Sequence, residues 1–315
     1  MQLDIFNDSR DVMLRNDLLQ ALQAHDAAQA QAALQKLQLD YPQDLLLPHA
    51  QVMLTALHAR TQQAQQAGQV VPFTQHAELR AQRVWLLETL APSARRVMDA
   101  RAVQAWLGPF WQDLAARAAH LPFASESEQD HAAWLLLQLQ DWQACSDAVA
   151  QIASWRRIPA PLSWRVQAKL QLHGLRATWP LLAELAWLAP QRLVTLNVAT
   201  PAPQLQRLMA QFESDWDELE ALAPPDAATL KRAADAGSSK AFPWFPAWVL
   251  TTQPQHAPDL ALAQPGQHSA PEQAMRLLIN LLGLEHQGRH HDLVKLRKNL
   301  RGLHAGLYAA YMKTR

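Results

Sequence analysis

Apolar residues recur at intervals of three and four along most of this chain, and that spacing places them on one face of a helix. The first example runs from Val12 to Leu22. No segment alternates with a period of two for long enough to form a strand. The composition agrees, because the 315 residues are rich in Ala, Leu and Gln and contain only 9 Gly. We therefore predict an all-α fold of stacked antiparallel helix pairs.

Turn-forming residues divide the chain into consecutive helices. Pro92 and Gly108-Pro109 are expected to interrupt the stretch 75–120. The spacing predicts helices at 27–39, 46–66 and 203–222, and helix pairs at 128–140 with 142–154, 160–172 with 175–189 and 272–286 with 290–302. The predicted organisation is a tail at 1–9, a helical-repeat body at 10–222, a loop or linker at 223–243 and a C-terminal helical segment at 244–315 that packs on the body.

The helix pairs share a common spacing. The distance from the turn between two helices to the residue that ends the second helix is 16 positions for Asp26 to Pro42, Gly174 to Pro190 and Gly288 to His304, and 17 for Trp142 to Pro159. Second helices also begin with a small residue that apolar residues follow four and seven positions later. This order predicts close approach of the paired helices and an inward-facing side. Its members are Ala30, Leu34 and Leu37; Cys145, Val149 and Ile152; and Thr178, Leu182 and Leu185.

This sequence pattern resembles the tetratricopeptide repeat, in which a turn, a small residue and a closing Pro recur in helix pairs. The resemblance covers about half of the chain and is degenerate, since residues 43–127 fit no repeat. An irregular helical bundle is the alternative. The resemblance implies a non-catalytic interaction or scaffold protein whose groove binds a protein or peptide partner. Twelve Trp residues are spread from Trp85 to Trp248, and Trp142 and Trp164 are the surface contacts that we predict on the body.

A short motif near the N-terminus supports a different function. The residues Gln2-Leu3-Asp4-Ile5-Phe6 are similar to the peptide that bacterial replication and repair proteins insert into the DNA polymerase sliding clamp, which reads Gln-Leu-(Ser or Asp)-Leu-Phe. The resemblance implies that Gln2 contacts the pocket rim and that Leu3, Ile5 and Phe6 fill apolar pockets. The protein would then be a DNA replication or repair accessory. Alternatively, the tail folds back on the first helix pair, and Asn7-Asp8-Ser9 caps a helix that starts near Arg10.

Two polar clusters near the C-terminus carry weaker functional hypotheses. Lys295, Arg297, Lys298 and Arg301 lie away from the leucine face of their helix, so contact with phosphate or nucleic acid is an alternative to a solvated outer face. His286, His290 and His291 form the densest group of imidazoles, and two of them have the spacing of helix-borne metal ligands. Gly288 falls between them, so we interpret the group as an exposed turn and predict no metal. An enzyme with a site around these histidines is the third hypothesis.

Composition and missing motifs set the remaining expectations. The sequence has no Gly-rich phosphate loop, metalloprotease helix or nucleophile elbow, so we predict neither catalysis nor a cofactor. The formal net charge is zero, which gives no overall attraction to nucleic acid or to an anionic membrane. Cys145 is the only cysteine, so a reducing compartment fits best. With no signal peptide and no long apolar run, we expect a cytoplasmic protein without membrane contact. The oligomeric state stays open.

Overall fold

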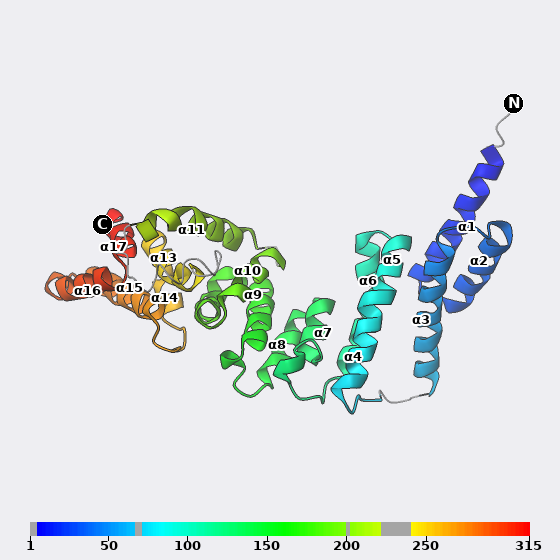
Figure 1. Cartoon of the computed structure of the whole chain (residues 1–315), viewed down its shortest axis with the longest axis horizontal. Coiled ribbons are helices and arrows are strands. Elements are labelled where there is room, and N and C mark those ends of the chain that lie inside the picture. The colour runs from blue at the N-terminus through cyan, green and yellow to red at the C-terminus, as the bar shows by residue number, and fades with distance from the viewer. Residues whose placement is uncertain (1–4, 67–70, 200–201, 222–240) are drawn as a thin grey trace. The chain divides into compact units, whose positions relative to one another are not determined.

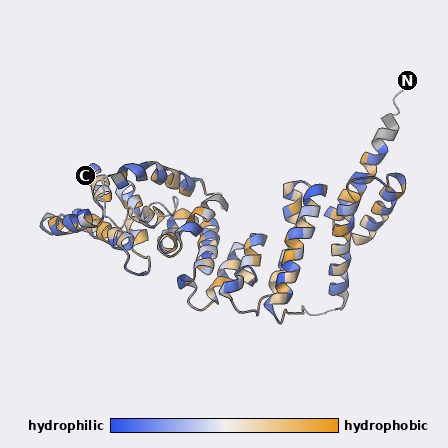
Figure 2. Cartoon of the chain, in the orientation of Figure 1, coloured by the Kyte–Doolittle hydropathy of each residue, from blue (hydrophilic) through white to orange (hydrophobic). Residues whose placement is uncertain are grey.

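The computed structural model describes residues 5–66, 71–199, 202–221 and 241–315, and these residues form helices and no strand (Figure 1). The predicted all-α class is therefore confirmed. The chain divides into two compact units, residues 1–141 and 142–315, each with its own buried apolar core. Hydrophobic and hydrophilic residues alternate along the helices of both units (Figure 2). The predicted division differs, and most of its linker at 223–243 lies outside the described residues.

Most helices of the first unit pack on their near neighbours in the chain: α1 on α2, α2 on α3, α3 on α5, α5 on α6 and α6 on α7. Trp106 joins more distant parts, because its indole N–H donates to the carbonyl of Leu22 at 2.7 Å. The elements of this unit are α1 (Ile5–Gln23), α2 (Ala27–Asp40), α3 (Leu47–Gln66), α4 (His76–Trp85), the π-helical turn η1 (Leu86–Leu90), α5 (Ala91–Val97), α6 (Ala100–Arg117), η2 (Ser125–Ser127) and α7 (Ala132–Leu139).

The second unit is organised around one short apolar helix, α13, which contacts α9, α11, α15 and α17. Residues 245–251 of α13 are all buried, so an element late in the chain fills the centre of the unit. Its elements are α8 (Trp142–Ala150), η3 (Trp155–Arg157), α9 (Pro159–Leu188), α10 (Pro190–Ala199), α11 (Pro203–Ala221), η5 (Phe242–Trp244), α13 (Phe245–Thr252), η6 (Pro254–His256), α14 (Ala257–Leu260), α15 (Ala270–His286), α16 (His290–Leu303) and α17 (Ala305–Lys313).

The predicted turns have a common backbone conformation. His25, Gln140 and Gly288 end their helices with a positive φ between 56° and 71°. In each, this residue donates to the carbonyl three positions earlier, and the next residue donates to the carbonyl five positions earlier. This is the Schellman pattern, which satisfies the last free carbonyls of a helix. Gly174 also has a positive φ, 73°, and breaks α9 into the two predicted helices.

The predicted inward face of the second helices is confirmed. All nine residues of the small-then-apolar pattern are buried, and Ala30, Cys145 and Thr178 have no exposed surface. Small residues at these positions let the neighbouring helix approach, while the larger ones fill the space beside it. A stacked repeat and a bundle share this burial, so the tetratricopeptide-like arrangement stays a prediction. The division between units falls at Asp141, within the predicted pair 128–140 and 142–154.

Several predicted boundaries were wrong. Pro92 does not interrupt a helix, because α4, η1 and α5 follow each other without a gap from His76 to Val97. The helices predicted at 128–140 and 142–154 are shorter, since α7 spans Ala132–Leu139 and α8 spans Trp142–Ala150. Gly108-Pro109 does not end a helix, since α6 continues from Ala100 to Arg117 with Pro109 inside it. Pro109 removes one backbone hydrogen bond, but buried aromatic residues on both sides, Trp106 and Phe110, hold this stretch in the core. The first helix begins at Ile5 and not near Arg10, while residues 1–4 and the side chains of 5–9 lie outside the described part.

A buried ion-pair cluster attaches the segment before α7 to α4. Asp130 Oδ2 lies 2.7 Å from Arg80 Nε, and Asp130 Oδ1 lies 2.8 Å from Arg83 Nε. Next to it, His131 is the N-cap of α7, and its Nδ1 accepts a hydrogen bond from the backbone N–H of Ala133 at 3.1 Å. That contact requires neutral imidazole. Burial, followed by the charge of His76, lowers the pKa of His131 to about 4.

We expect this histidine to make the protein less stable in mild acid. In the unfolded chain its pKa is near the ordinary value of about 6.5, so the unfolded state binds the proton more tightly, and stability is lost as pH falls from about 6.5 to 4. At about pH 5 the loss is about 2 kcal/mol. His131→Asn keeps a cap acceptor that does not titrate. The measurement is urea unfolding at about pH 7.5 and pH 5, and equal losses in the variant and the wild type would contradict the expectation.

Candidate functional site

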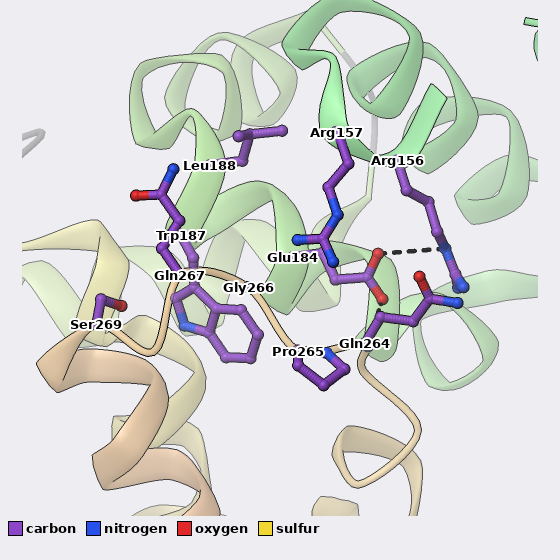
Figure 3. Close-up of a pocket in the computed structure, with 10 residues that line it drawn as sticks. All are labelled: Arg156, Arg157, Glu184, Trp187, Leu188, Gln264, Pro265, Gly266, Gln267 and Ser269. Carbon is purple, nitrogen blue, oxygen red and sulfur yellow. Dashed lines mark hydrogen bonds and ion pairs between the residues drawn. The ribbon is translucent and has the colours of Figure 1, made fainter. Parts of the chain in front are cut away.

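A pocket in the second unit is lined by the turn η3, the end of α9 and the loop before α15. Its volume is about 160 Å³. Figure 3 shows its lining, in which the Arg157 guanidinium points into the space between Trp187 and Glu184. The remaining lining residues are Arg156, Leu188, Gln264, Pro265, Gly266, Gln267 and Ser269.

Glu184 is the buried carboxylate of this pocket. Its Oε1 accepts a hydrogen bond from the backbone N–H of Gln264 at 2.8 Å, and its Oε2 lies 3.2 Å from Arg156 Nε. Burial raises the pKa of Glu184, against the hydrogen bond from Gln264 and the positive charges of Arg156 and Arg157. Because both carboxylate oxygens already have partners, Glu184 is suited to hold the pocket together and not to transfer protons.

A second buried carboxylate, Glu272, shapes the loop of the pocket. It accepts hydrogen bonds from the backbone N–H groups of Gly266 and His268, both at 2.9 Å, and forms an ion pair with Arg276 at 3.1 Å. Burial alone would raise the pKa of Glu272, but these hydrogen bonds outweigh it and lower the pKa. His268 has a positive φ of 55°. The loop that forms one wall is therefore fixed by side-chain contacts before any ligand binds.

The first unit contains a groove of a different character. It has a volume of about 170 Å³, a wall of apolar atoms that includes Leu86 and Phe110, and Trp85 at its edge. The Trp85 side chain is 40% exposed. The other lining residues are Ala56, Ala59, Arg60, Gln63, Gln82, Asp113 and Leu114. We call this surface the Trp85 groove.

A π-helical turn positions the wall of the Trp85 groove. The backbone N–H of Ala91 donates to the carbonyl of Leu86, five residues earlier, and Pro92 follows immediately. Proline cannot donate to the carbonyl four residues before it and its ring clashes there, so a wider turn in front of it relieves the clash. Such turns inside α-helices occur frequently at functional sites.

The tryptophans predicted as surface contacts have different surroundings. Trp142 is half-buried at the start of α8. The prediction for Trp164 was wrong, because this side chain is 5% exposed in α9. Trp164 shares a helical face with Ala160 and Ala168, four residues away on each side, and both are fully buried. An aromatic residue in the middle of a buried face is part of the core.

The basic residues predicted on the last helices are not equivalent. Arg297 forms an ion pair with Glu285 at 3.1 Å and also contacts Tyr311, so its charge is used within the unit, and its role as a phosphate contact stays a prediction. Lys295, Lys298 and Arg301 are exposed on α16. For these three, phosphate contact also stays a prediction.

The remaining predicted site residues are the three histidines near the C-terminus and the N-terminal motif. His286 and His291 are exposed, and the side chain of His290 is not described. Within the described residues, no three His, Cys, Asp or Glu side chains form a group that could hold a metal ion.

Gln2 and Leu3 lie outside the described residues, and Ile5 and Phe6 are described only as the first backbone residues of α1. Among the helices that the structure describes, none is both long and apolar enough to cross a bilayer.

Comparison of the chain with protein-family models, with curated proteins and with solved structures finds no match. Function must therefore be inferred from the two concave surfaces. Neither surface was predicted from the sequence. Trp85 could have been noticed as a tryptophan seven residues before Pro92, and Arg156-Arg157 as an arginine doublet beside a tryptophan. Neither pattern predicts that residues about 30 positions away complete the Trp85 groove, or that residues about 100 positions away complete the pocket around Arg157.

Proposed function

We propose that this chain is a non-catalytic helical interaction protein that binds a protein or peptide partner, and that the Trp85 groove is a binding surface for that partner. The observation that carries the proposal is the indole of Trp85, 40% exposed at the edge of an apolar groove. Tryptophan is the residue type most enriched among side chains that dominate binding energy at protein interfaces. A large apolar ring left in water beside an apolar groove favours a partner that covers it.

The groove suits one apolar side chain of a polypeptide. Its volume of about 170 Å³ is below the roughly 300 to 1,000 Å³ typical of small-molecule sites. Two amide side chains, Gln63 and Gln82, are among the lining residues, and amides match the donors and acceptors of a peptide backbone. Gln82 accepts a hydrogen bond from Arg117 through Oε1 at 2.9 Å, which leaves its NH₂ group to donate to a ligand carbonyl.

The test is selection of peptides on the full-length protein from a random displayed library, followed by anisotropy measurements on the selected peptides. We expect them to share an apolar residue. Trp85→Ala is expected to weaken binding by about tenfold or more, the effect of truncating a dominant interface residue. Because Trp85 is partly exposed, the variant should retain the wild-type helical content, which circular dichroism checks.

Leu45→Ala is the matched control, since Leu45 is an exposed apolar residue of the same unit outside the groove. The control should bind the selected peptides as the wild type does. Equal loss in both variants, or selected peptides that are indifferent to Trp85→Ala, would refute the groove. Recruitment to the sliding clamp through Gln2, Leu3, Ile5 and Phe6 stays an alternative proposal that rests on the sequence motif alone.

A further inference from the structure

Three cationic side chains interact with a single buried carboxylate in the second unit, and a fourth, Arg165, interacts with one of them. Arg156 and Arg157 leave the turn η3, Arg165 and Lys169 lie one turn apart on α9, and Glu184 faces them from the second half of α9. Burial, then the charges of Arg165 and Arg156, lower the pKa of Lys169. Gathering like charges in a partly buried region is unfavourable unless negative charge compensates them, and Glu184 supplies one charge only.

The cationic side chains differ in whether they already have interaction partners within the protein. Arg156 pairs with Glu184, and Arg165 donates to the carbonyl of Ser146 and lies 5.5 Å from the Trp155 ring. Within the described part of the chain, the guanidinium of Arg157 has no hydrogen-bond partner. It is exposed and lines the pocket. Arg157 is therefore the residue that can bind an incoming anion without breaking an existing contact.

The pocket wall also contains an unused donor. The indole N–H of Trp187 is buried and has no hydrogen-bond partner among the described residues. Buried polar groups are nearly always paired in folded proteins, so this unpaired donor is an exception in the pocket wall. Leu188 and Pro265 add apolar surface to the same wall.

We propose that this pocket binds the carboxylate of a glutamate or aspartate in an acidic segment of a partner protein, with Arg157 as the main ligand-binding residue. A guanidinium matches the planar carboxylate with two parallel hydrogen bonds. A volume of about 160 Å³ admits one side chain and is below the range of small-molecule sites. Glu184 repels a doubly charged phosphate more strongly than a singly charged carboxylate, and the apolar wall fits a peptide residue next to the acid.

The probe is a fluorescein-labelled heptapeptide with two central glutamates flanked by leucines, titrated against the full-length protein at low salt. We expect saturable binding that weakens as salt increases and is absent for the same peptide with glutamines. Arg157→Glu should reduce the affinity by about tenfold or more, as expected for loss of a charge-assisted contact. Arg157→Lys should retain part of the affinity, because it keeps the charge without the planar fork.

Arg207→Glu is the matched control, since it makes the same charge change at an exposed arginine of α11 in the same unit, outside the pocket. It should bind the glutamate peptide normally. Equal loss in Arg207→Glu, equal binding of the glutamine peptide, or tighter binding of a phosphoserine peptide would overturn the proposal. Self-association that Arg157→Glu abolishes would also overturn it. The ligand would then be the acidic end of α11 in a second copy, which carries Glu213, Asp215, Asp217, Glu218 and Glu220. The Trp85 groove lies in the other unit. Trp85→Ala should therefore bind the glutamate peptide normally, so that failure of the groove proposal can be told apart from failure of the pocket proposal.

Discussion

Replacement of Gly306 by alanine is expected to lower the free energy of unfolding of the second unit by about 3 kcal/mol, near the top of the range for over-packed sites. Gly306 lies in the first turn of α17, which packs on α11. A Cβ atom at this position would come within 2.7 Å of the Leu219 carbonyl carbon and 2.8 Å of its Cα, and closer still to the carbonyl oxygen. Backbone atoms cannot rotate away as a side chain can, so the two helices would have to separate.

The control for this prediction is Gly302→Ala on α16. A Cβ at Gly302 meets no atom within 4 Å, and alanine is the better helix former by about 0.5 to 1 kcal/mol. We therefore expect the two substitutions to have opposite signs. Urea unfolding followed by circular dichroism compares them under identical conditions. A Gly306→Ala midpoint equal to or above that of the wild type would show that the contact between α11 and α17 is looser than described.

The second large effect is expected for Asp130→Ala. Asp130 is 1% exposed, and its two carboxylate oxygens bind Arg80 and Arg83. Arg83 is itself buried, so removing the carboxylate leaves an uncompensated charge in the core of the first unit. Breaking a buried ion pair in this way costs about 3 to 5 kcal/mol. The measurement is the urea midpoint of the full-length protein at neutral pH.

Asp40→Ala provides a control at an exposed ion pair. Asp40 lies 2.7 Å from Arg10, the same separation as between Asp130 and Arg80, but the Arg10 side chain is 65% exposed. Exposed pairs are typically worth less than about 1 kcal/mol, because water screens them and side-chain entropy opposes them. An equal decrease in the free energy of unfolding in the two variants would mean that Asp130 is as exposed to solvent as a surface residue.

Patterns within single helices were predicted well. Ala30, Leu34 and Leu37 follow each other within one helix, so their common face depends only on the helical repeat of 3.6 residues. Gly174 and Gly288 were predicted at turns, and both have positive φ, a conformation that glycine adopts without a steric penalty. Pro109 was misjudged, because whether a helix continues through proline depends on how firmly its neighbours hold it.

Sites assembled from distant segments could not be predicted. Arg157 and Gln264 line one pocket although more than 100 residues separate them, and Trp164 was mistaken for a surface residue because exposure depends on which helix covers it. The amino-acid sequence alone determined the all-α class, the positions of most helices and their inward faces, because these depend on contacts within a few residues. Only the tertiary structure decided that two cores form, that α13 lies at the centre of the second, and that Trp85 and Arg157 border concave surfaces. Those outcomes depend on which apolar faces pair across long stretches of chain, and the local helical pattern carries no information about that pairing.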